Sequence, residues 1–495
     1  MTHAHLHNPT APATVDHHTG SKLVSAHITS FIKQSLLSVS AEEAFAWHAR
    51  TGAFERLSPP WQRVDVIDKQ GTIRDGDRLK MRMKIGPFSK HWIAAHRDYI
   101  QGQQFRDVQI TGPFAKWDHT HRFEMVGANS CRLVDHIDYQ LPLGGLGRLF
   151  GSGHAARTLQ SVFAYRHRLT QHDLSMHAKY AGKTRLKVAI TGATGMIGSA
   201  LTALLTTGGH EVIRLVRGDK TTGPDEAKWD ATTGLLEPEK LEGIDAVVHL
   251  AGENVAGGRW TDARKKRILE SRSIATRVLC DSLARLKNPP RSLISGSAIG
   301  YYGDGGENTL DETSASGDGF LAQVCREWEA NTKPAELAGI RVVHSRFGVV
   351  LSPRGGALAK MLTPFKLGAG GPIGSGKQMM SWITLDDVIS AIHHLIMHDQ
   401  VSGPVNLVAP NAVTNREFGQ TLGRVLHRPA FAPLPAFIAR LAFGQMADEM
   451  LLTGARVLPR RLLETQFAFR DPTLEEALRW CLGRMKTPEN SLVSA

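Results

Sequence analysis

The sequence is poor in cysteine and has no long apolar run, and each absence excludes a class of protein. Its four cysteines are scattered over 495 residues, so the sequence predicts neither a disulfide framework nor a metal site built on cysteine. Apolar runs such as DAVVHLAG fall far short of the ~20 residues that span a bilayer. The N-terminus has no apolar central region of the kind that marks a secretory signal. We therefore expect a cytoplasmic protein without a transmembrane segment.

The chain is basic, with a formal net charge of +12. Such a balance suits nucleic acid or anionic membranes, and it suits a site for phosphorylated cofactors equally well. The sequence shows no recognition helix, zinc finger or ribonucleoprotein motif, so nucleic acid is not an expected partner. Histidines are frequent in residues 1–20, among Pro, Thr and Ala and without periodicity. This pattern is typical of a disordered tail, and we predict no metal site.

A chain of this length exceeds one ordinary hydrophobic core, so two or three domains are expected. Residues 21–178 are mainly β in character. Six segments, from QRVDVID to CRLVDHIDYQLP, include several that alternate polar and apolar residues as strands with one wet face do. A helical pattern follows from about Gly153 to His172. This order predicts an α+β domain in which a curved antiparallel sheet grips one long helix.

The element order and the segment LVDHIDYQLPLGGLG make this domain similar to the START-like, or polyketide cyclase/dehydrase-like, helix-grip fold. The resemblance implies a cavity between sheet and helix for an apolar ligand. An interior filled by side chains, with the domain serving as a docking or stability module, is the equal alternative.

A polar basic segment, 179–185, links this domain to a second one with a different pattern. In residues 186–405, strand-like segments such as LKVAIT, HEVIRLV, DAVVHLAG and RSLISGS alternate with helical ones. This alternation predicts the α/β class, a doubly wound parallel sheet of the Rossmann type with helices on both faces. Residues 406–495 are predicted to form a small, mainly helical C-terminal domain.

The most specific segment, KVAITGATGMIGSALTALL, follows the first strand of this sheet. The strand ends at Thr191, and Gly192, Gly195 and Gly198 lead into a helix. The first glycine permits a tight turn, the second lets the backbone approach a pyrophosphate, and the third lets helix and strand pack closely. The helix N-terminus offers amide N–H groups to the phosphates. The predicted cofactor residues here are Thr191, Gly192, Gly195, Met196, Ile197 and Gly198.

The second strand, EVIRLV, is followed by Arg217, where an NAD site usually has an acidic residue. A carboxylate there would bind the ribose 2′-hydroxyl, whereas an arginine would pair with a 2′-phosphate. With Lys220 nearby, the sequence favours NADP over NAD. The alternative is that Arg217 is an ordinary solvated residue at a strand end.

Three motifs together carry a family resemblance. The spacing TGxxGxxG, then HLAG at 249–252 and SGSAIGYYG at 295–303, is similar to the extended short-chain dehydrogenase/reductase superfamily. More narrowly, residues 187–480 resemble the nucleoside-diphosphate-sugar epimerase-like family that has its own small C-terminal domain. The matching stretches include HLAGENVAGGRWTDARKKRILESR, SAIGYYGDGG and GALAKMLTPFKLGAGGPIGSGKQMMSWITLDDV.

The resemblance implies roles for further residues. Asp230 would approach the adenine, and the segment 346–348 would follow the strand that borders the nicotinamide. Ser297 would hydrogen-bond a substrate oxygen. The residues expected to line the cofactor with backbone are Leu250, Ala251 and Gly252. The residues expected at the substrate are Lys377, Gln378 and Trp382.

The proton-transfer pair of the superfamily is absent. There, a tyrosine acts as general acid and base, and a lysine four residues later lowers its pKa. None of the six tyrosines of this chain has a lysine at that distance. Tyr301 or Tyr302, close behind Ser297, is one replacement. Another is Glu327 or Glu329, where we expect solvated or salt-bridged helix residues, or the pair Glu253 and Asn254 beyond HLAG. The third alternative is that the domain binds NADP without turnover.

Two hypotheses follow from these patterns. The first is an NADP-dependent oxidoreductase or epimerase for an unidentified small molecule, with Ser297 and Tyr301 or Tyr302 as catalytic residues. The second is a non-catalytic NADP-binding regulator whose N-terminal domain senses an apolar molecule. The missing lysine favours the second, while the retained serine and the intact cofactor loop favour the first, which we adopt.

Overall fold

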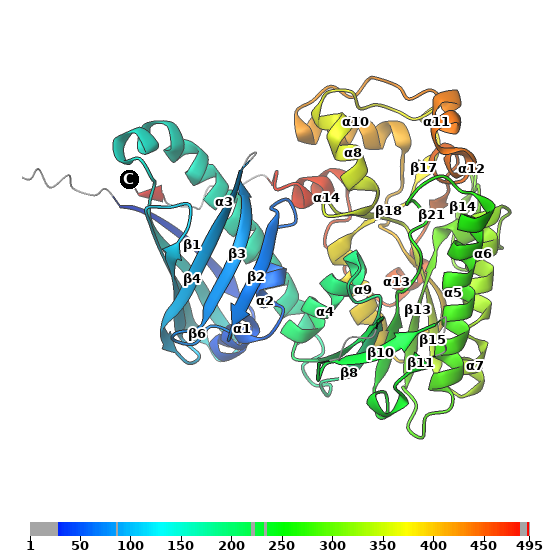
Figure 1. Ribbon diagram of the computed structural model, residues 1–495, viewed down its shortest axis with the longest axis horizontal. Coiled ribbons are helices and arrows are strands. Elements are labelled where there is room, and N and C mark those ends of the chain that lie inside the picture. The colour runs from blue at the N-terminus through cyan, green and yellow to red at the C-terminus, as the bar shows by residue number, and fades with distance from the viewer. Residues whose placement is uncertain (1–27, 86–87, 219–222, 232–234, 486–492, 495) are drawn as a thin grey trace, which may run out of the picture.

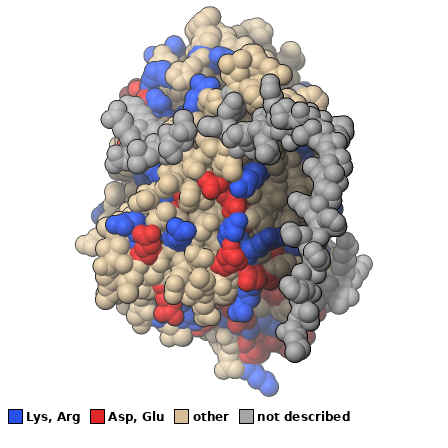
Figure 2. All heavy atoms as spheres, turned by 90° about the vertical axis from the view of Figure 1, so that its left-hand side faces the viewer, with Lys and Arg blue, Asp and Glu red and all other residues tan. Residues whose placement is uncertain are grey.

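The computed structural model describes residues 28–85, 88–218, 223–231, 235–485 and 493–494. The predicted tail 1–20 and Lys220 lie outside these residues. Figure 1 shows two units side by side: a β unit with one long helix, and a larger α/β unit. On the face of the molecule shown in Figure 2, Lys and Arg are interspersed with Asp and Glu, so the basic excess does not gather there into one patch.

The N-terminal unit is built on an eight-stranded antiparallel sheet in the order β2-β3-β4-β5-β6-β7-β1-β22. Its strands are β1 (Thr29–Leu37), β2 (Val64–Gln70), β3 (Arg78–Ile85), β4 (Phe88–Ile100), β5 (Gln104–Thr111), β6 (Lys116–Gly127), β7 (Ser130–Gln140) and β22 (Val493–Ser494). Helices α1 (Ala41–Ala49) and α2 (Ala53–Leu57) connect β1 to β2. Helix α1 begins after Ser40 because the Ser40 side chain accepts a hydrogen bond from the Glu43 N–H.

The long helix α3 (Gly144–Ala178) packs against this sheet. Its predicted apolar stripe is buried, with Phe163 and Leu169 at 1% and 0% exposed. The helix is longer at both ends than the pattern 153–172 predicts. Its first turns present Leu146 and Phe150 to solvent, so they carry no buried stripe from which the sequence could reveal them.

The α/β unit contains a second eight-stranded sheet, in the order β11-β10-β9-β8-β12-β13-β15-β19. Its strands are β8 (Lys187–Thr191), β9 (Glu211–Val216), β10 (Glu226–Asp230), β11 (Leu235–Leu236), β12 (Ala246–His249), β13 (Ser292–Ala298), β15 (Arg341–Phe347) and β19 (Gly403–Leu407). All pairings are parallel except that of β10 with β11. The predicted fold class is confirmed.

Helices cover both faces of this sheet (Figure 1). One face packs against α4 (Met196–Thr207) and α9 (Leu385–Met397). The other packs against α5 (Asp262–Leu283), α6 (Phe320–Ala330) and α7 (Lys333–Leu337). The strands of the sheet centre are apolar and fully buried, as parallel strands covered on both faces must be.

The rest of the α/β unit consists of short elements. They are the 3₁₀ helices η1 (Pro238–Lys240) and η2 (Ile299–Tyr302), the strands β14 (Thr309–Leu310), β16 (Val349–Leu351), β17 (Met379–Met380), β18 (Trp382–Thr384), β20 (Val413–Thr414) and β21 (Arg456–Val457), the helices α8 (Gly356–Lys366), α10 (Asn415–Leu426), α11 (Ala436–Phe443), α12 (Gln445–Ala447), α13 (Arg460–Glu464) and α14 (Leu474–Cys481), and the π-helical turn η3 (Asp448–Leu452). Across the described ranges, no helix combines the length and apolarity that crossing a membrane demands.

Helix α3 belongs to the cores of both units. Tyr165 of α3 stacks on Trp480 of α14 with ring centroids 4.5 Å apart. Nearby, the buried Arg56 of α2 pairs with Asp173 of α3 at 2.8 Å and with Asp386 of α9 at 2.9 Å. The two units are therefore joined by a packed and charge-paired interface.

Candidate functional site

The turn between β8 and α4 leaves space for backbone only. Gly192 has a φ of +66°, and a Cβ on it would lie 2.9 Å from the carbonyl group of Leu250. A Cβ on Gly198 would lie 2.3 Å from the Gly192 carbonyl oxygen. Any larger side chain would push main chain apart, so the glycines hold this turn close to the next strand, as a dinucleotide-binding turn requires.

Helix α4 begins directly at this turn. Gly195 is its N-cap, no side chain caps the helix, and its first turn contains no acidic residue. The first amides of the helix, on Met196, Ile197 and Gly198, therefore carry an uncompensated partial positive charge beside the glycine turn. This arrangement suits the binding of a diphosphate.

The hydroxyl of Thr191 joins the ends of two strands. It accepts the N–H groups of Leu250 and Ala251, at 3.0 and 3.2 Å, and lies 2.8 Å from His249 Nδ1. With both amides donating to it, the hydroxyl gives its own proton to Nδ1, so His249 is neutral and its Nε2–H donates to Thr276 at 3.1 Å. Burial lowers the pKa of His249 to about 4, in agreement. The Thr191 side chain thus fixes the predicted cofactor-lining segment 250–252, and does so from inside the protein.

Two further predicted cofactor residues lie at the ends of β9 and β10, which are on the opposite side of β8 from β12. Arg217 is exposed just beyond β9. Asp230 ends β10, is half-buried and faces Leu235 in the ladder with β11. The strand order therefore brings both to the carboxyl edge of the sheet, on the same side as the glycine turn.

A row of polar side chains crosses three neighbouring strands at this edge. Ser297 of β13 stands opposite Arg346 of β15, and Arg346 stands opposite Asn406 of β19. Ser297 Oγ donates to Glu329 Oε1 of α6 at 2.7 Å. The Arg346 guanidinium binds both oxygens of Glu329 at 2.8 Å. Ser297 is 1% and Arg346 is 3% exposed, so the network is enclosed.

The two tyrosines that follow Ser297 in the sequence contact Arg346 in different ways. Tyr302 is 3% exposed; its hydroxyl accepts from Arg346 Nη1 at 3.0 Å and donates to Asn406 Oδ1 at 2.8 Å. Burial raises the pKa of Tyr302 against the opposing effect of Arg346, so the phenol keeps its proton. Tyr301 is only partly buried, and the guanidinium carbon of Arg346 lies 3.5 Å from its ring centroid. Tyr301 is thus the accessible member of the pair.

Comparison with protein families divides the chain into three matches. Residues 188–408 match the NAD dependent epimerase/dehydratase family, residues 434–481 a domain of unknown function (DUF1731), and residues 37–163 the family of polyketide cyclase / dehydrase and lipid transport. The epimerase family protein Mb2239 of Mycobacterium bovis is 44% identical over 297 residues, which cover 60% of this chain and 98% of that protein. The chain belongs to the epimerase family.

Solved structures extend the likeness beyond the epimerase domain. The nucleoside-diphosphate sugar epimerase from Corynebacterium glutamicum is 34% identical with a TM-score of 0.76, and the match covers 92% of this chain and 91% of that one. The human epimerase family protein SDR39U1, crystallised with NADPH, is 38% identical with a TM-score of 0.56, over 61% of this chain and 100% of that one. The resemblances predicted for both domains are confirmed.

In this epimerase-family chain the three predicted substrate residues differ in accessibility. Lys377 is exposed. Gln378 is half-buried, and its amide donates to the carbonyls of Ile373 and Leu451 at 3.1 and 2.6 Å. Trp382 is 0% exposed, and its indole N–H donates to the Asn411 carbonyl at 3.0 Å. The structure therefore leaves Lys377 available to a ligand and shows Gln378 and Trp382 holding the C-terminal loops together.

Sequence reasoning missed how the epimerase-family site is held together. It named Ser297 and expected Glu329 to be salt-bridged, and the structure shows that ion pair. It did not find Arg346 as the cation beside the tyrosines, nor Asn406 as their anchor. The available signal was the unusual pair of polar residues, Arg and Asn, in the apolar strands VVHSRFG and PVNLV, since buried polar groups in parallel strands need partners.

The N-terminal unit of the chain holds a cavity of about 170 Å³. Sheet residues and helices α2 and α3 enclose it. Its wall is largely apolar, with Leu79, Met81 and Trp92, but His119 and His121 also line it. The predicted space between sheet and helix is therefore present, with a polar side that the sequence did not lead us to expect.

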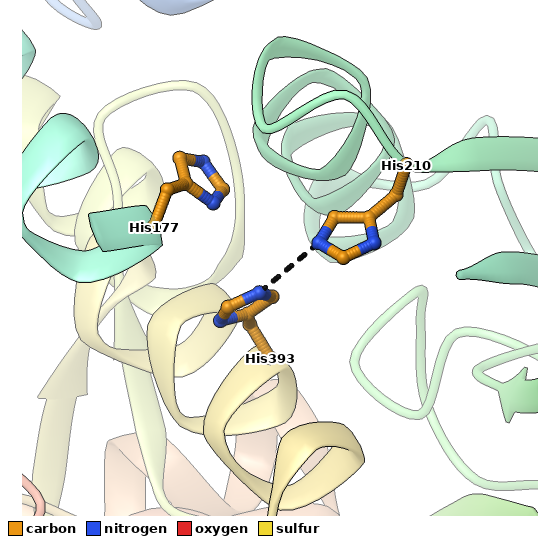
Figure 3. A group of neighbouring side chains, drawn as sticks. All are labelled: His177, His210 and His393. Carbon is orange, nitrogen blue, oxygen red and sulfur yellow. Dashed lines mark hydrogen bonds between the residues drawn. The ribbon is translucent and has the colours of Figure 1, made fainter. Parts of the chain in front are cut away.

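Three histidines also meet where the two units join (Figure 3). His177 ends α3, His210 precedes β9, and His393 lies on α9, with 3.4 Å between Nε2 of His210 and Nε2 of His393. The Leu186 N–H donates to His210 Nδ1 at 3.0 Å, so His210 carries its proton on the Nε2 that faces His393. Neither ring nitrogen of the buried His177 has a hydrogen-bond partner. This junction cluster therefore consists of two rings, His210 and His393, that share a hydrogen bond, and of His177, which makes none.

Proposed function

We propose that this epimerase-family protein is an NADP-dependent oxidoreductase or epimerase acting on a small molecule. The observation that carries the proposal is the glycine turn between β8 and α4, where a Cβ on Gly192 or Gly198 would meet main chain. The NADPH in the crystal of the human relative supports it. When bound, NADP supplies the hydride donor or acceptor of the reaction.

Preference for NADP rests on Arg217. Its guanidinium is permanently charged, planar and exposed at the end of β9. A phosphate on the adenosine ribose would find a bidentate partner there, whereas a ribose hydroxyl would find no carboxylate at this position.

Within this proposal, Tyr301 transfers the proton. Arg346 supplies beside it the positive charge that lysine supplies in the superfamily, and it is held by Glu329. Tyr302 and Ser297 position this pair, because Tyr302 binds Arg346 and Ser297 binds Glu329. Substrate would reach Tyr301 from the carboxyl edge of the sheet.

The cofactor proposal is tested by titrating the purified full-length protein with NADPH and NADH in a calorimeter. We expect NADPH to bind more tightly, and Gly198→Ala to weaken it at least tenfold, since the added methyl group would lie 2.3 Å from a carbonyl oxygen. Gly182→Ala is the matched control, because nothing lies within 4 Å of its Cβ position. Arg217→Asp should reverse the order of the two coenzymes. Absence of binding at millimolar concentrations would overturn the proposal.

The catalytic assignment is tested by following label exchange from deuterated NADPH into a metabolite extract. Tyr301→Phe should slow the exchange about 10²- to 10⁴-fold, the usual contribution of a general acid or base. An unchanged rate in this variant would remove Tyr301 from the reaction.

A second candidate function is supported by the enclosure of the site. Ser297 and Tyr302 are 1% and 3% exposed, with their hydroxyls already bonded, as in a domain that binds NADP without turnover. Tight NADPH binding together with no label exchange into any extract would favour this non-catalytic sensor.

For the N-terminal cavity we infer an apolar ligand rather than a purely structural role. Its size and its apolar wall support this inference. Native mass spectrometry of protein purified from cells should then show a co-purified apolar molecule, which mild organic extraction removes.

A further inference from the structure

Four acidic and histidine side chains converge on one face of the N-terminal sheet. Asp107 of β5 stands opposite His119 of β6, and His121 of β6 stands opposite Asp135 of β7. Residues two apart on a strand share a face, so all four side chains point the same way. His119, His121 and Asp135 are buried, and Asp107 lines the cavity together with both histidines.

Asp135 faces one nitrogen of each imidazole ring. Its Oδ1 lies 2.9 Å from His119 Nε2 and 2.6 Å from His121 Nδ1. Its Oδ2 lies 2.7 Å from His167 Nε2, and the other nitrogen of His167 lies 2.9 Å from Ser35 Oγ. The contacts of His119 and His167 are hydrogen bonds, so the carboxylate fixes an N–H on the side of these two rings that faces it. The short contact to His121 Nδ1 lies outside hydrogen-bond geometry.

The opposite nitrogens of the two rings both face Asp107. His119 Nδ1 lies 3.3 Å and His121 Nε2 lies 3.2 Å from the same oxygen, Oδ1. The other oxygen, Oδ2, accepts the Trp117 indole N–H at 3.2 Å. With its Nε2–H directed at Asp135, His119 presents the lone pair of Nδ1 to Asp107, whereas His121 Nε2 is hydrogen-bonded to Asp107 and presents a lone pair once it gives up its proton. One ligand atom from each of the three residues converges on this point.

Three ligand atoms at this separation can hold a cation between them. Two ligands whose bonds of ~2.1 Å meet at a right angle lie roughly 3 Å apart, which agrees with the distances to Asp107. Asp107 and Asp135 contact both rings with their carboxylates, whereas Arg166, which also lines the cavity, donates its Nε–H to the Leu57 carbonyl at 3.1 Å. The immediate surroundings of the two rings are therefore anionic, as a dication requires.

We propose that His119, His121 and Asp107 bind a divalent transition-metal ion, with Asp135 as the carboxylate that orients both rings. Two histidines and one carboxylate on one side of an ion leave its remaining positions to other ligands, as in non-haem iron and catalytic zinc sites. Here those positions face the cavity, so a cavity ligand with an oxygen or nitrogen atom would coordinate the ion. The site is independent of the NADP proposal.

The junction cluster of His177, His210 and His393 lacks these features. The Leu186 amide already fixes the proton of His210 on the nitrogen that faces His393. Apart from His210 of the same cluster, the charges that act on His177 are the guanidiniums of Arg185, Arg56 and Arg50, and they repel a metal ion as they repel a proton. This cluster therefore serves as the matched control.

The test uses the full-length protein after removal of metals by a chelator and dialysis. Cobalt(II) chloride is titrated in, and the visible absorption of the bound ion is recorded together with the metal content of the dialysed protein. We expect the wild type to bind one equivalent more than His121→Gln, with a ligand-field band that this variant lacks. Asp135→Asn should weaken binding about 10- to 100-fold, as loss of an orienting carboxylate does, and His393→Gln should bind as the wild type does.

The histidines of residues 1–20 are present in every variant, so any binding to them cancels in the comparison. Circular dichroism checks that each variant folds, and Asp107→Asn, which keeps the side-chain size, decides the outcome if His121→Gln does not fold. Equal stoichiometry and equal spectra in the wild type and the variant of the site would overturn the proposal. So would a loss of the same equivalent in His393→Gln.

Discussion

At the scale of single residues, the ion pair of Arg346 and Glu329 is the electrostatic centre of the epimerase-family site. Burial opposes the charge of Arg346, but Glu329 outweighs it and holds the pKa of the guanidinium above its usual value. Ser297 and Tyr302 add one hydrogen bond each to this pair. The pair therefore stabilises the fold and places a charge next to Tyr301 at the same time.

We predict that Glu329→Gln destabilises the α/β unit by about 3–5 kcal/mol, because it leaves a buried guanidinium without its counter-charge. Urea unfolding of the full chain, followed by tryptophan fluorescence, measures the shift. Glu464→Gln is the control, since it breaks an Arg–Glu pair, with Arg460, on the protein surface and should change stability little. A Glu329→Gln protein as stable as this control would show that Arg346 does not depend on Glu329.

One row of residues shows how much of the site could be predicted from the sequence. Ser297 was predicted because a motif surrounds it. Arg346 and Asn406 were not assigned to the same network, because their meeting depends on the register of β13, β15 and β19. The glycine turn was predictable residue by residue, since its spacing reflects steric limits that act within one turn of chain.

At the scale of elements, helix α10 shows how a local sequence signal becomes structure. Thr414 accepts the Glu417 N–H, and the Glu417 carboxylate accepts the Thr414 N–H at 2.7 Å, which is a complete capping box. Helix α14 begins with Thr473, whose side chain accepts no such bond. The chain thus contains a capped and an uncapped threonine at comparable helix starts.

We predict that Thr414→Ala weakens the start of α10 by about 1 kcal/mol. The amides of its first turns should then exchange about fivefold faster in hydrogen–deuterium exchange mass spectrometry, which reports local opening. Thr473→Ala, the matched control, should change exchange at the start of α14 much less. Equal changes in both helices would mean that the capping box contributes nothing beyond threonine itself.

Most strands of the two sheets were predictable from alternation and apolar runs, but β1 and β22 and the start of α3 were not predicted. The start of α3 carries exposed leucines and several glycines, so neither burial nor propensity marks it. Strand β22 is two residues long and pairs with β1 from the far end of the chain. Its place depends on a contact between the two ends of the chain, and no local pattern encodes such a contact.

At the scale of the whole molecule, the N-terminal and α/β units share buried polar groups. Arg56 binds an aspartate from each unit, and the junction cluster gathers one histidine from α3 and two from the α/β unit. Burial lowers the pKa of His177 to about 3 and that of His210 to about 4, and it holds the pKa of His393 well below its usual value. The interface between the units is therefore built from rings that stay neutral while the protein is folded.

Acid should destabilise this interface. A histidine in the unfolded chain has a pKa of ~6.5. Between pH 6.5 and about 4, these histidines therefore bind protons in the unfolded chain but not in the folded one. Stability that is complete above pH 6.5 is then lost as the pH falls, by about 1.4 kcal/mol per pH unit for each such ring. We predict that His177→Phe, which removes one ring whose nitrogens have no hydrogen-bond partner, makes the melting temperature fall less steeply between pH 6.5 and 4.5 than in the wild type. His154→Phe, at an exposed position of the same helix, should leave the slope unchanged, and equal slopes in all three proteins would show that the buried ring of His177 does not set the acid limit of the interface.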